Sequence, residues 1–474
     1  MKYLFHFLFL FLSIESFAQD KNVKITIKAL GSTNDKVLIT SSNLFFGNDT
    51  LAKTTLDAEG NAVLEIQLSQ PIFVGIKIGN KGGTGYLMPN DNVGLSIDLK
   101  DEKSIYTFTG KGAEANNYLA QSGAVFSEYF RFNGKPINGW EPEIFASRLA
   151  VMEKAFADFH QNYMSKSSLP QNTGKLLEAS TRMAPLSFKK NYIMAYFNTP
   201  EEKEKMPELL KKVYGEIPFS DELLKAKHNE YASVLTYHFY DLADPFFKGK
   251  TPEEKRVIYL QFPNYADQKI KKGNYSATVK EFLLAKNVYE AFRDGISEIA
   301  TSLYNDFVNS YPSSIYLASI DRKYQKWLTL SKGTPAPDFV GLTPEGKKVS
   351  LSNLKGKIVY VDIWATWCAP CREELPKAKE IQKQFSTNEK ITFLYVSIDD
   401  KTDKWKSFLK SDPDFKGLHI NISNQELVGK LYKAYQMAGV PTYLLIDQEG
   451  KIASAPASRP SSGKVEDEIR GLLK

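Results

Sequence analysis

Cysteine content constrains this chain more than any other feature of its sequence. The 474 residues include only two cysteines, Cys368 and Cys371, which are separated by Ala369 and Pro370. A disulfide stabilises a fold mainly by closing a long loop, and a two-residue spacer closes almost none. The fold must therefore rest on apolar cores. The same spacing allows reversible exchange, because the second thiol can resolve a mixed disulfide that the first has formed. We therefore interpret the pair as a redox-active disulfide.

Two other interpretations of the cysteine pair stay open, an inert disulfide and half of a metal site. A protein metal site needs three or four ligands. Residues 331–474, which contain the pair, have His419 as their one histidine. We therefore expect neither a metal nor a cofactor.

The amino terminus has the pattern of a secretory signal peptide. Residues 1–18 carry the cation Lys2, then an apolar run from Tyr3 to Leu12, then small residues at Ser16 and Ala18 that suit signal peptidase. The run is shorter than the roughly 20 residues of a membrane-spanning helix. We expect removal of residues 1–18 and export to the periplasm. An uncleaved anchor is the alternative.

Composition and charge bound the class of protein. Hydrophobic residues at 42% and charged residues at 24% are typical of globular proteins. The length favours two to four domains. The net charge of +6 is spread along the chain, and the lysine-rich stretches 203–212 and 269–272 are mixed with glutamate or lie in short turns. No basic stripe accompanies them, so we predict no nucleic-acid partner.

Two compositional regimes follow the signal. Residues 19–112 alternate apolar and polar positions in short runs separated by Gly, Asn and Asp, which predicts an all-β sandwich or barrel. Residues 113–330 have apolar positions three and four apart, which predicts helices. Candidate helix starts lie at Thr199, Ser220 and Thr251. The clearest helical segments are 144–159, 223–240 and 279–308.

The third regime, residues 331–474, opens with a linker from Ser331 to Pro337 that contains two prolines and a glycine. Strand and helix patterns then alternate, which predicts an α/β layer fold. The expected strands are 358–363, 391–398, 442–446 and 452–455, and the expected helices are 370–384, 427–437 and 465–473.

The residues around the cysteines resemble a known family. The stretch from Val361 to Cys371, followed later by Gly439-Val440-Pro441-Thr442, resembles the thioredoxin superfamily. Two further stretches, 335–339 and 351–357, narrow the resemblance to the TlpA/ResA-like thiol-disulfide oxidoreductases of the bacterial cell envelope. This resemblance covers residues 333–474 and implies a thioredoxin fold. The preceding β domain and helical region resemble secreted Bacteroidetes proteins, a likeness that implies no activity.

The two cysteines have different predicted roles. Cys368 falls where a strand ends and a helix begins, so backbone N–H groups and the helix dipole would stabilise its thiolate. We predict that Cys368 attacks the substrate and that Cys371, one turn further in and more buried, resolves the mixed disulfide. The uncharged Ala369-Pro370 spacer favours a reductant over a strong oxidant.

Two acids are candidates to accept the proton that Cys371 must lose. Asp362 lies inside an apolar strand, where resemblance to thioredoxins implies a buried acid whose pKa would rise. Glu374 lies one turn beyond Cys371 and resembles the glutamate of ResA-like proteins at that offset. The alternatives are a polar Asp362 satisfied by the backbone and a solvated Glu374 that helps the helix dipole. How the two acids divide the work stays open.

Substrate contacts are expected on both sides of Cys368. The resemblance implies a cis Val440–Pro441 bond, which would present the Val440 backbone to an extended peptide; a trans turn proline is the alternative. Trp367 is a predicted rim contact, and Trp364 a core residue.

These observations predict a periplasmic thiol-disulfide oxidoreductase that reduces disulfide-bearing proteins. The resemblance implies a membrane electron donor of the DsbD/CcdA type. A peroxiredoxin would need threonine and proline where this chain has Ala365 and Val361. The alternative function is a partner- or glycan-binding protein with an auxiliary redox module.

Overall fold

The computed structural model describes residues 21–473 except 45–46, 131–139, 198–201, 203, 207, 209, 211–218, 252–253, 256–257 and 294. The predicted signal and the predicted helix start at Thr199 lie outside the described residues. Across the described ranges, every helix is too short or too polar to cross a membrane. The chain divides into two compact units, one of residues 1–257 with 269–283 and one of residues 258–268 with 284–474.

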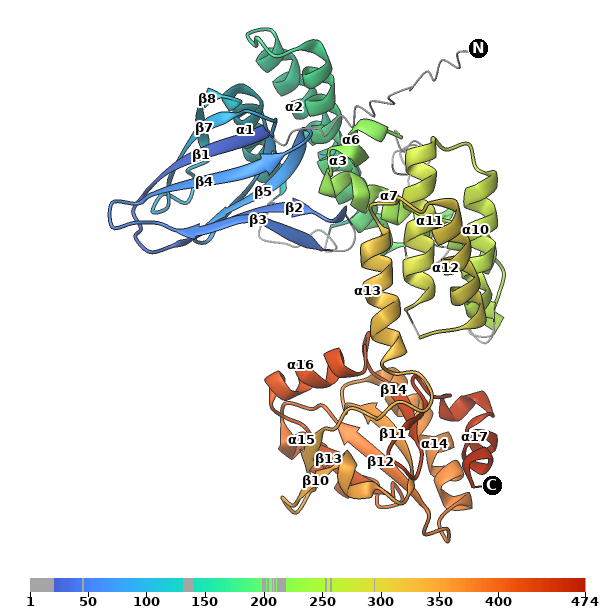
Figure 1. Cartoon of the computed structure of the whole chain (residues 1–474). Helices are drawn as coiled ribbons and strands as arrows, with labels where there is room; N and C mark the ends of the chain where they lie inside the picture. The colour runs from blue at the N-terminus through green and yellow to red at the C-terminus, as the bar shows by residue number, and fades with distance from the viewer. Residues whose placement is uncertain are drawn as a thin grey trace, which may run out of the picture. The chain divides into compact units, whose positions relative to one another are not determined.

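The first unit begins with two four-stranded sheets that enclose one apolar core (Figure 1). Alternate residues of the first strand, such as Val23, Ile25 and Ile27, are buried, as the two-residue period of a strand requires. The all-β fold predicted for this region is therefore confirmed, as a sandwich. One sheet has the order β4 (Asn61–Leu68), β1 (Lys21–Leu30), β7 (Asn92–Asp98), β8 (Thr107–Lys111), and the other β3 (Asn48–Thr55), β2 (Lys36–Ser42), β5 (Ile72–Ile78), β6 (Lys81–Leu87).

The helix α1 (Ala113–Phe130) closes an edge of each sheet. The side chain of Asn116 pairs with both the N–H and the C=O of Tyr86 on β6, at 2.8 Å each. Asn117 pairs in the same way with Phe108 on β8, also at 2.8 Å. Backbone groups of a sheet edge need such partners when they are covered.

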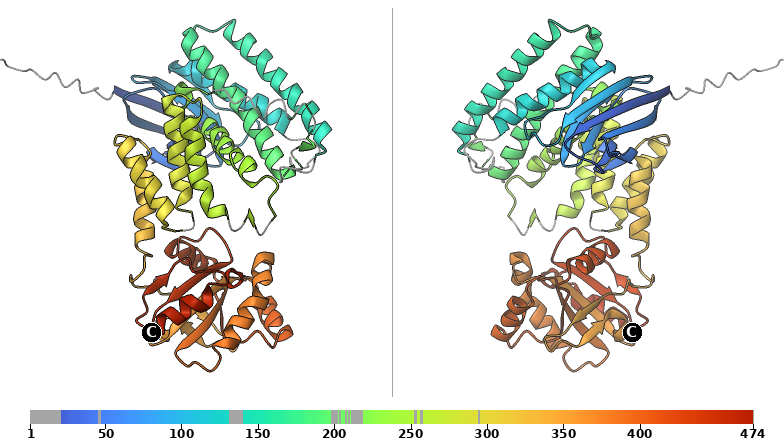
Figure 2. Two further views of the ribbon diagram at one scale, coloured as in Figure 1. Left: turned by 90° about the vertical axis from the view of Figure 1, so that its right-hand side faces the viewer. Right: turned by 90° about the vertical axis from the view of Figure 1, so that its left-hand side faces the viewer.

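The helical region of the first unit confirms the predicted helices with one interruption. Helices α1, α2 (Pro142–Met164) and α3 (Gln171–Tyr196) lie side by side (Figure 2). Ser220 caps α6 (Asp221–Lys225) as predicted, and its Oγ accepts the N–H of Leu223 at 3.2 Å. The segment 223–240 is not one helix, because Lys227 has a φ of 56° and α7 (Asn229–Asp241) begins afresh. The short helix α8 (Ala243–Phe247) follows.

The later helices are η3 (Tyr259–Gln261), α10 (Phe262–Lys272), α11 (Ala277–Ala291), α12 (Glu298–Ser310) and α13 (Leu317–Leu328). The segment 279–308, expected to be helical, is interrupted between α11 and α12, where Gly295 has a φ of 110° that favours glycine. Ser297 then caps α12 by accepting the N–H of Ala300 at 3.1 Å.

The second unit contains a seven-stranded sheet in the order β10 (Lys348–Ser350), β9 (Val340–Leu342), β13 (Leu418–Asn421), β12 (Ile391–Ser397), β11 (Ile358–Trp364), β14 (Thr442–Ile446), β15 (Ile452–Ser454). Strands β11, β12 and β13 are parallel, and the remaining pairs are antiparallel. Every residue of β11 is buried, as expected for a central strand of a covered sheet.

Four helices and two short turns complete this layer: α14 (Ala369–Gln384), α15 (Thr402–Ser411), α16 (Gln425–Ala434), α17 (Val465–Leu472), η4 (Leu351–Leu354) and η5 (Pro460–Ser462). Helices α14 and α17 lie next to each other, and Arg470 of α17 covers the ring of Phe385 after α14 (Figure 1). The predicted α/β fold is confirmed. The sequence patterns missed β9, β10, β13 and α15, because the strands are too short to display a period and α15 has few apolar residues.

The predicted linker does not isolate the α/β layer from the helices before it. Gly333 donates its N–H to the carbonyl of Ile452, and Ile452 donates to Thr334, both at 2.8 Å. Helices α12 and α13 lie within the same compact unit as this layer. The domain boundaries at residues 112 and 330 stay predictions.

Candidate active site

Cys368 and Cys371 form a disulfide at the amino terminus of α14. Cys368 is the cap residue, and its Sγ accepts the backbone N–H of Cys371 at 3.2 Å. Its exposed fraction is 4% and that of Cys371 is 1%, while neighbouring Trp367 is 63% exposed. The strand β11 ends four residues before Cys368, so the sheet fixes the chain that leads into the cap. An N–H aimed at Sγ would also stabilise a thiolate there.

The Val440–Pro441 bond is cis. Sγ of Cys368 lies 3.6 Å from the carbonyl oxygen of Val440, so this turn borders the disulfide directly. Both turn residues are half-buried. Trp364 is fully buried and packs against Phe408 at 5.2 Å between ring centroids, as predicted for a core residue.

Asp362 lies in the middle of β11, between Tyr395 of β12 and Tyr443 of β14. It is 1% exposed, and its Oδ1 has no hydrogen-bond partner among the described residues. Burial, and secondarily the Glu374 carboxylate, raise the pKa of Asp362 well above its usual range. The predicted burial of Asp362 is confirmed.

Glu374 is held by a turn that is remote in sequence. It is 5% exposed, its Oε2 accepts the backbone N–H of Ser461 at 2.9 Å, and its Oε1 accepts the Ser461 hydroxyl at 2.8 Å. The alternative of a solvated Glu374 is therefore wrong. Sequence reasoning missed Ser461, because a serine in a loop carries no local sign of a partner 87 residues away.

A buried polar network, also missed, fixes the loop that leads into Cys368. Asp399 accepts both the N–H of Thr366, at 3.0 Å, and its hydroxyl, at 2.7 Å. Ser397 donates to the same carboxylate at 2.8 Å, and Asn421 donates to the Asp399 carbonyl at 3.0 Å. The sequence could have indicated Asp399, because this residue directly follows the predicted strand 391–398. In α/β sheets, functional loops gather at the carboxyl ends of the strands.

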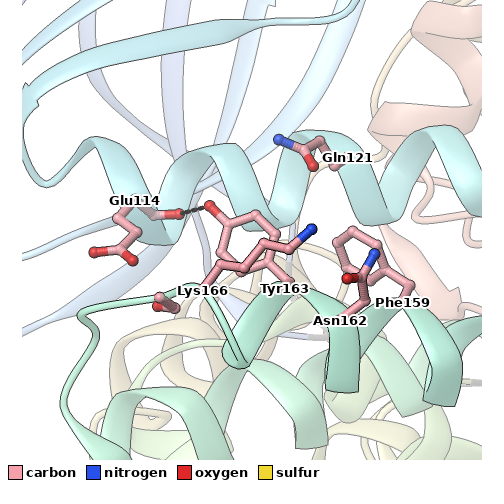
Figure 3. Close-up of a pocket in the computed structure, with 7 residues that line it drawn as sticks. Glu114, Gln121, Phe159, Asn162, Tyr163 and Lys166 are labelled. Atoms are coloured by element: carbon pink, nitrogen blue, oxygen red, sulfur yellow. Dashed lines mark hydrogen bonds between the residues drawn. The ribbon is translucent and has the colours of Figure 1, made fainter.

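A separate groove of about 310 Å³ lies in the first unit (Figure 3). Its aromatic residues are Phe159 and Tyr163 of α2, and the Tyr163 hydroxyl donates to the Glu114 carbonyl at 2.8 Å. The remaining lining residues are Gln121, Asn162, Lys166 and Ser167. The groove contains neither cysteine.

This unit combines a mixed β-sheet with covering helices, a closely spaced disulfide at a helix amino terminus, and a cis proline beside that disulfide. These features define a thioredoxin-fold thiol-disulfide oxidoreductase. Comparison with known proteins agrees with this class. The Redoxin family model matches residues 331–467. The chain is 30% identical over 139 residues to the thiol-disulfide oxidoreductase ResA of Bacillus subtilis, which covers 29% of this chain and 74% of that protein. It is also 30% identical over 140 residues to ResA of Bacillus cereus, and this alignment covers 30% of this chain and 78% of that protein.

Two solved structures also match part of the chain. One is the thioredoxin domain of a thiol-disulfide oxidoreductase from Bacteroides vulgatus, with 28% identity, 31% of this chain, 99% of that chain and a TM-score of 0.28. The other is a thioredoxin-family thiol:disulfide interchange protein from Chlorobium tepidum, with 27% identity, 30% of this chain, 99% of that chain and a TM-score of 0.26. On the evidence of the sequence relatives, the chain belongs to the ResA-like thiol-disulfide oxidoreductases and is an enzyme of that class.

Proposed function

We propose that this protein is a periplasmic reductase of protein disulfides that works through Cys368 and Cys371. The observation that carries the proposal is the position of the disulfide, with a backbone N–H on Sγ of Cys368 and the Val440 carbonyl beside it. The signal-like pattern of residues 1–18 supports export. The uncharged spacer supports the reducing direction, because no added cation stabilises the thiolate.

The reaction begins with the reduced pair. The Cys368 thiolate attacks one sulfur of the substrate disulfide, a new sulfur–sulfur bond forms, and the other substrate sulfur leaves as a thiolate. Cys371 then loses its proton and attacks Sγ of Cys368, which releases the second substrate thiolate. Two electrons have passed to the substrate, and the protein holds the Cys368–Cys371 disulfide. A membrane donor of the DsbD/CcdA type would return two electrons and regenerate the dithiol.

We propose that the substrate peptide lies along the half-buried turn at Val440 and Pro441. The turn backbone would pair with an extended chain next to Sγ of Cys368, and the exposed Trp367 would contact its apolar side chains. Such backbone pairing tolerates many sequences, which suits a reductase with several protein substrates.

The two acids support the resolving step. Glu374 is one helical turn from Cys371 and accepts hydrogen bonds from Ser461 at both carboxylate oxygens. The raised pKa of Asp362 keeps this acid protonated to higher pH than an ordinary aspartate. We propose that Glu374 accepts the proton of Cys371 while Asp362 stays protonated beside it.

Cysteine variants of the full chain test this function. Cys368→Ser should abolish the reduction of insulin disulfides, because no thiolate remains to attack. Cys371→Ser should accumulate mixed disulfides with the substrate, visible on non-reducing gels, because the resolving thiol is lost.

Turnover by Cys368→Ser at the wild-type rate would refute the redox site. The reduction potential of the Cys368–Cys371 pair tests whether the protein reduces or oxidises its substrates. We expect a value near that of thioredoxin, about −270 mV. A value close to the DsbA value of about −120 mV would make the protein an oxidant instead.

A second candidate function is partner or glycan binding by the first unit, with the redox site as an auxiliary module. The observation that favours it is the groove of Figure 3, which combines two aromatic rings with amide and ammonium groups. Aromatic and amide side chains are common in sites that bind peptides or sugars.

A further inference from the structure

The carboxylate of Glu374 is held from outside its own helix. Turn η5 packs against α14, and Ser461 of this turn supplies one backbone and one side-chain donor to the two oxygens of Glu374. Ser461 itself is exposed, whereas Glu374 is 5% exposed. The next residue, Ser462, makes no such contact, since its hydroxyl donates to the Arg459 carbonyl at 2.6 Å.

We propose that Ser461 is a positioning residue that holds the Glu374 carboxylate in one orientation for transfer of the proton of Cys371. The inference rests on the proposed function. Two donors to one carboxylate restrict its rotation, which prepares the group for proton transfer. Asp362, with an unpartnered Oδ1, receives no comparable support. The two buried acids therefore differ in their hydrogen bonding, because η5 supplies two donors to Glu374 and Oδ1 of Asp362 has none among the described residues.

Other charged and titratable groups surround this pair. Asp362 approaches from β11 and Tyr443 from β14, and both interact with Glu374. Arg459, just before η5, also acts on Tyr443. Tyr360 of β11 interacts with Asp362 and with Glu468 of α17.

Loss of the Ser461 hydroxyl should move the pH dependence of the resolving step in one direction only. With one donor gone, the charged form of Glu374 loses stabilisation, so Glu374 binds a proton at higher pH than before. Below that pH the base is absent and Cys371 keeps its proton. The acid limb of the resolving rate must therefore move to higher pH, while the first attack by Cys368, which does not use Glu374, keeps its rate.

The test follows both steps with one probe. Reduced full-length protein is mixed with an aromatic disulfide whose released thiolates absorb visible light. The first thiolate reports the attack by Cys368, and the second reports resolution by Cys371. We expect Ser461→Ala to shift the acid limb of the second phase upward by about one pH unit, the size expected for one hydrogen bond to a charged group.

Three further variants test whether the shift arises from the hydrogen bond between Ser461 and Glu374. Ser462→Ala should keep the wild-type profile, and Ser461→Thr, which retains a hydroxyl, should restore it. In a Glu374→Gln background, Ser461→Ala should cause no further change, because the two residues act as a unit. A purely structural effect of Ser461 would instead appear equally in both backgrounds.

An unshifted acid limb in Ser461→Ala, with a slowed second phase in Glu374→Gln, would refute the role of Ser461 and leave the acid role of Glu374 intact. A second phase that is unchanged in Glu374→Gln would refute both roles. Neither result touches the redox assignment, which the Cys368→Ser variant tests separately.

Discussion

At the scale of single residues, Asp362 stands out as a carboxyl that the core does not satisfy. It is 1% exposed with an unpartnered oxygen in the centre of a seven-stranded sheet. A buried charge without a partner is costly, so the residue avoids the cost by holding its proton. At high pH, ionisation of Asp362 therefore lowers the stability of the folded protein. Asparagine at this position would not ionise, so it would not cause this loss. A buried carboxyl such as that of Asp362 is expected at a site of proton transfer.

We predict that Asp362→Asn stabilises the oxidised protein in a pH-dependent way. Burial raises the pKa of Asp362, so between the unfolded and folded pKa values the folded state binds more protons and its free energy of unfolding falls as pH rises. Asparagine removes this loss. We expect a gain of about 1–3 kcal/mol near pH 8 that vanishes near pH 4. Denaturant unfolding followed by tryptophan fluorescence measures it, and an equal gain at both pH values would mean altered packing instead.

At the scale of elements, His228 decides where α7 begins. Its Nδ1 accepts the N–H of Tyr231 at 3.1 Å, which requires a neutral ring with a free lone pair. The ring also meets Phe73 of β5 edge-on at 4.6 Å between centroids. Burial lowers the pKa of His228 to about 3. The junction between the sandwich and α7 therefore depends on an uncharged histidine.

We predict that acid weakens the first unit through His228. The folded pKa lies below the ordinary value, so the stabilisation is complete above the unfolded pKa of about 6.5 and is lost as pH falls toward the folded value. Between about pH 7 and pH 5 the loss should reach roughly 2 kcal/mol. His228→Asn keeps a side-chain acceptor at the cap but cannot gain a proton.

Thermal unfolding followed by circular dichroism at the two pH values should therefore show a smaller acid-induced loss in His228→Asn than in the wild type. If both proteins lose the same stability between these pH values, protonation of His228 is not the cause.

At the scale of the whole molecule, the chemistry and the groove belong to different compact units. The disulfide, both acids and the cis proline lie in the second unit, and the groove between α1 and α2 lies in the first. The Redoxin family model matches residues 331–467, the part of the chain that carries the disulfide. The groove is therefore separate from the disulfide chemistry, and partner binding by the first unit stays a proposal.

We predict that Lys166→Glu separates the two roles if the first unit binds the partner. Reduction of a small aromatic disulfide should stay at the wild-type rate, because the groove contains neither cysteine. Capture of native proteins by the Cys371→Ala trap should fall by about tenfold with the charge reversal, as for the loss of one good polar contact. Lys154→Glu, on an exposed part of α2, is the matched control. Undiminished capture by Lys166→Glu would remove the groove from consideration.

The amino-acid sequence by itself determined the class of fold and the centre of the chemistry. Period-two alternation identified the β region, and the strand before Cys368 with the helix after it placed the disulfide at a helix amino terminus. These features are local, since hydrophobic periodicity and caps are set by neighbours along the chain. The same locality explains the errors, because the positive φ values of Lys227 and Gly295 lie in short breaks between helices that the wider apolar pattern did not show.

Only the tertiary structure decided how the site is supported. Thr366 and Asp399 are 33 residues apart, and Glu374 and Ser461 are 87 residues apart. Neither pair has a signature in its own segment, because a serine or an aspartate in a loop is polar whatever it contacts. Their pairing depends on which strand ends and turns the folded chain brings beside the cysteines. The sequence could therefore name Glu374, but only the path of the chain could show that Ser461 holds it.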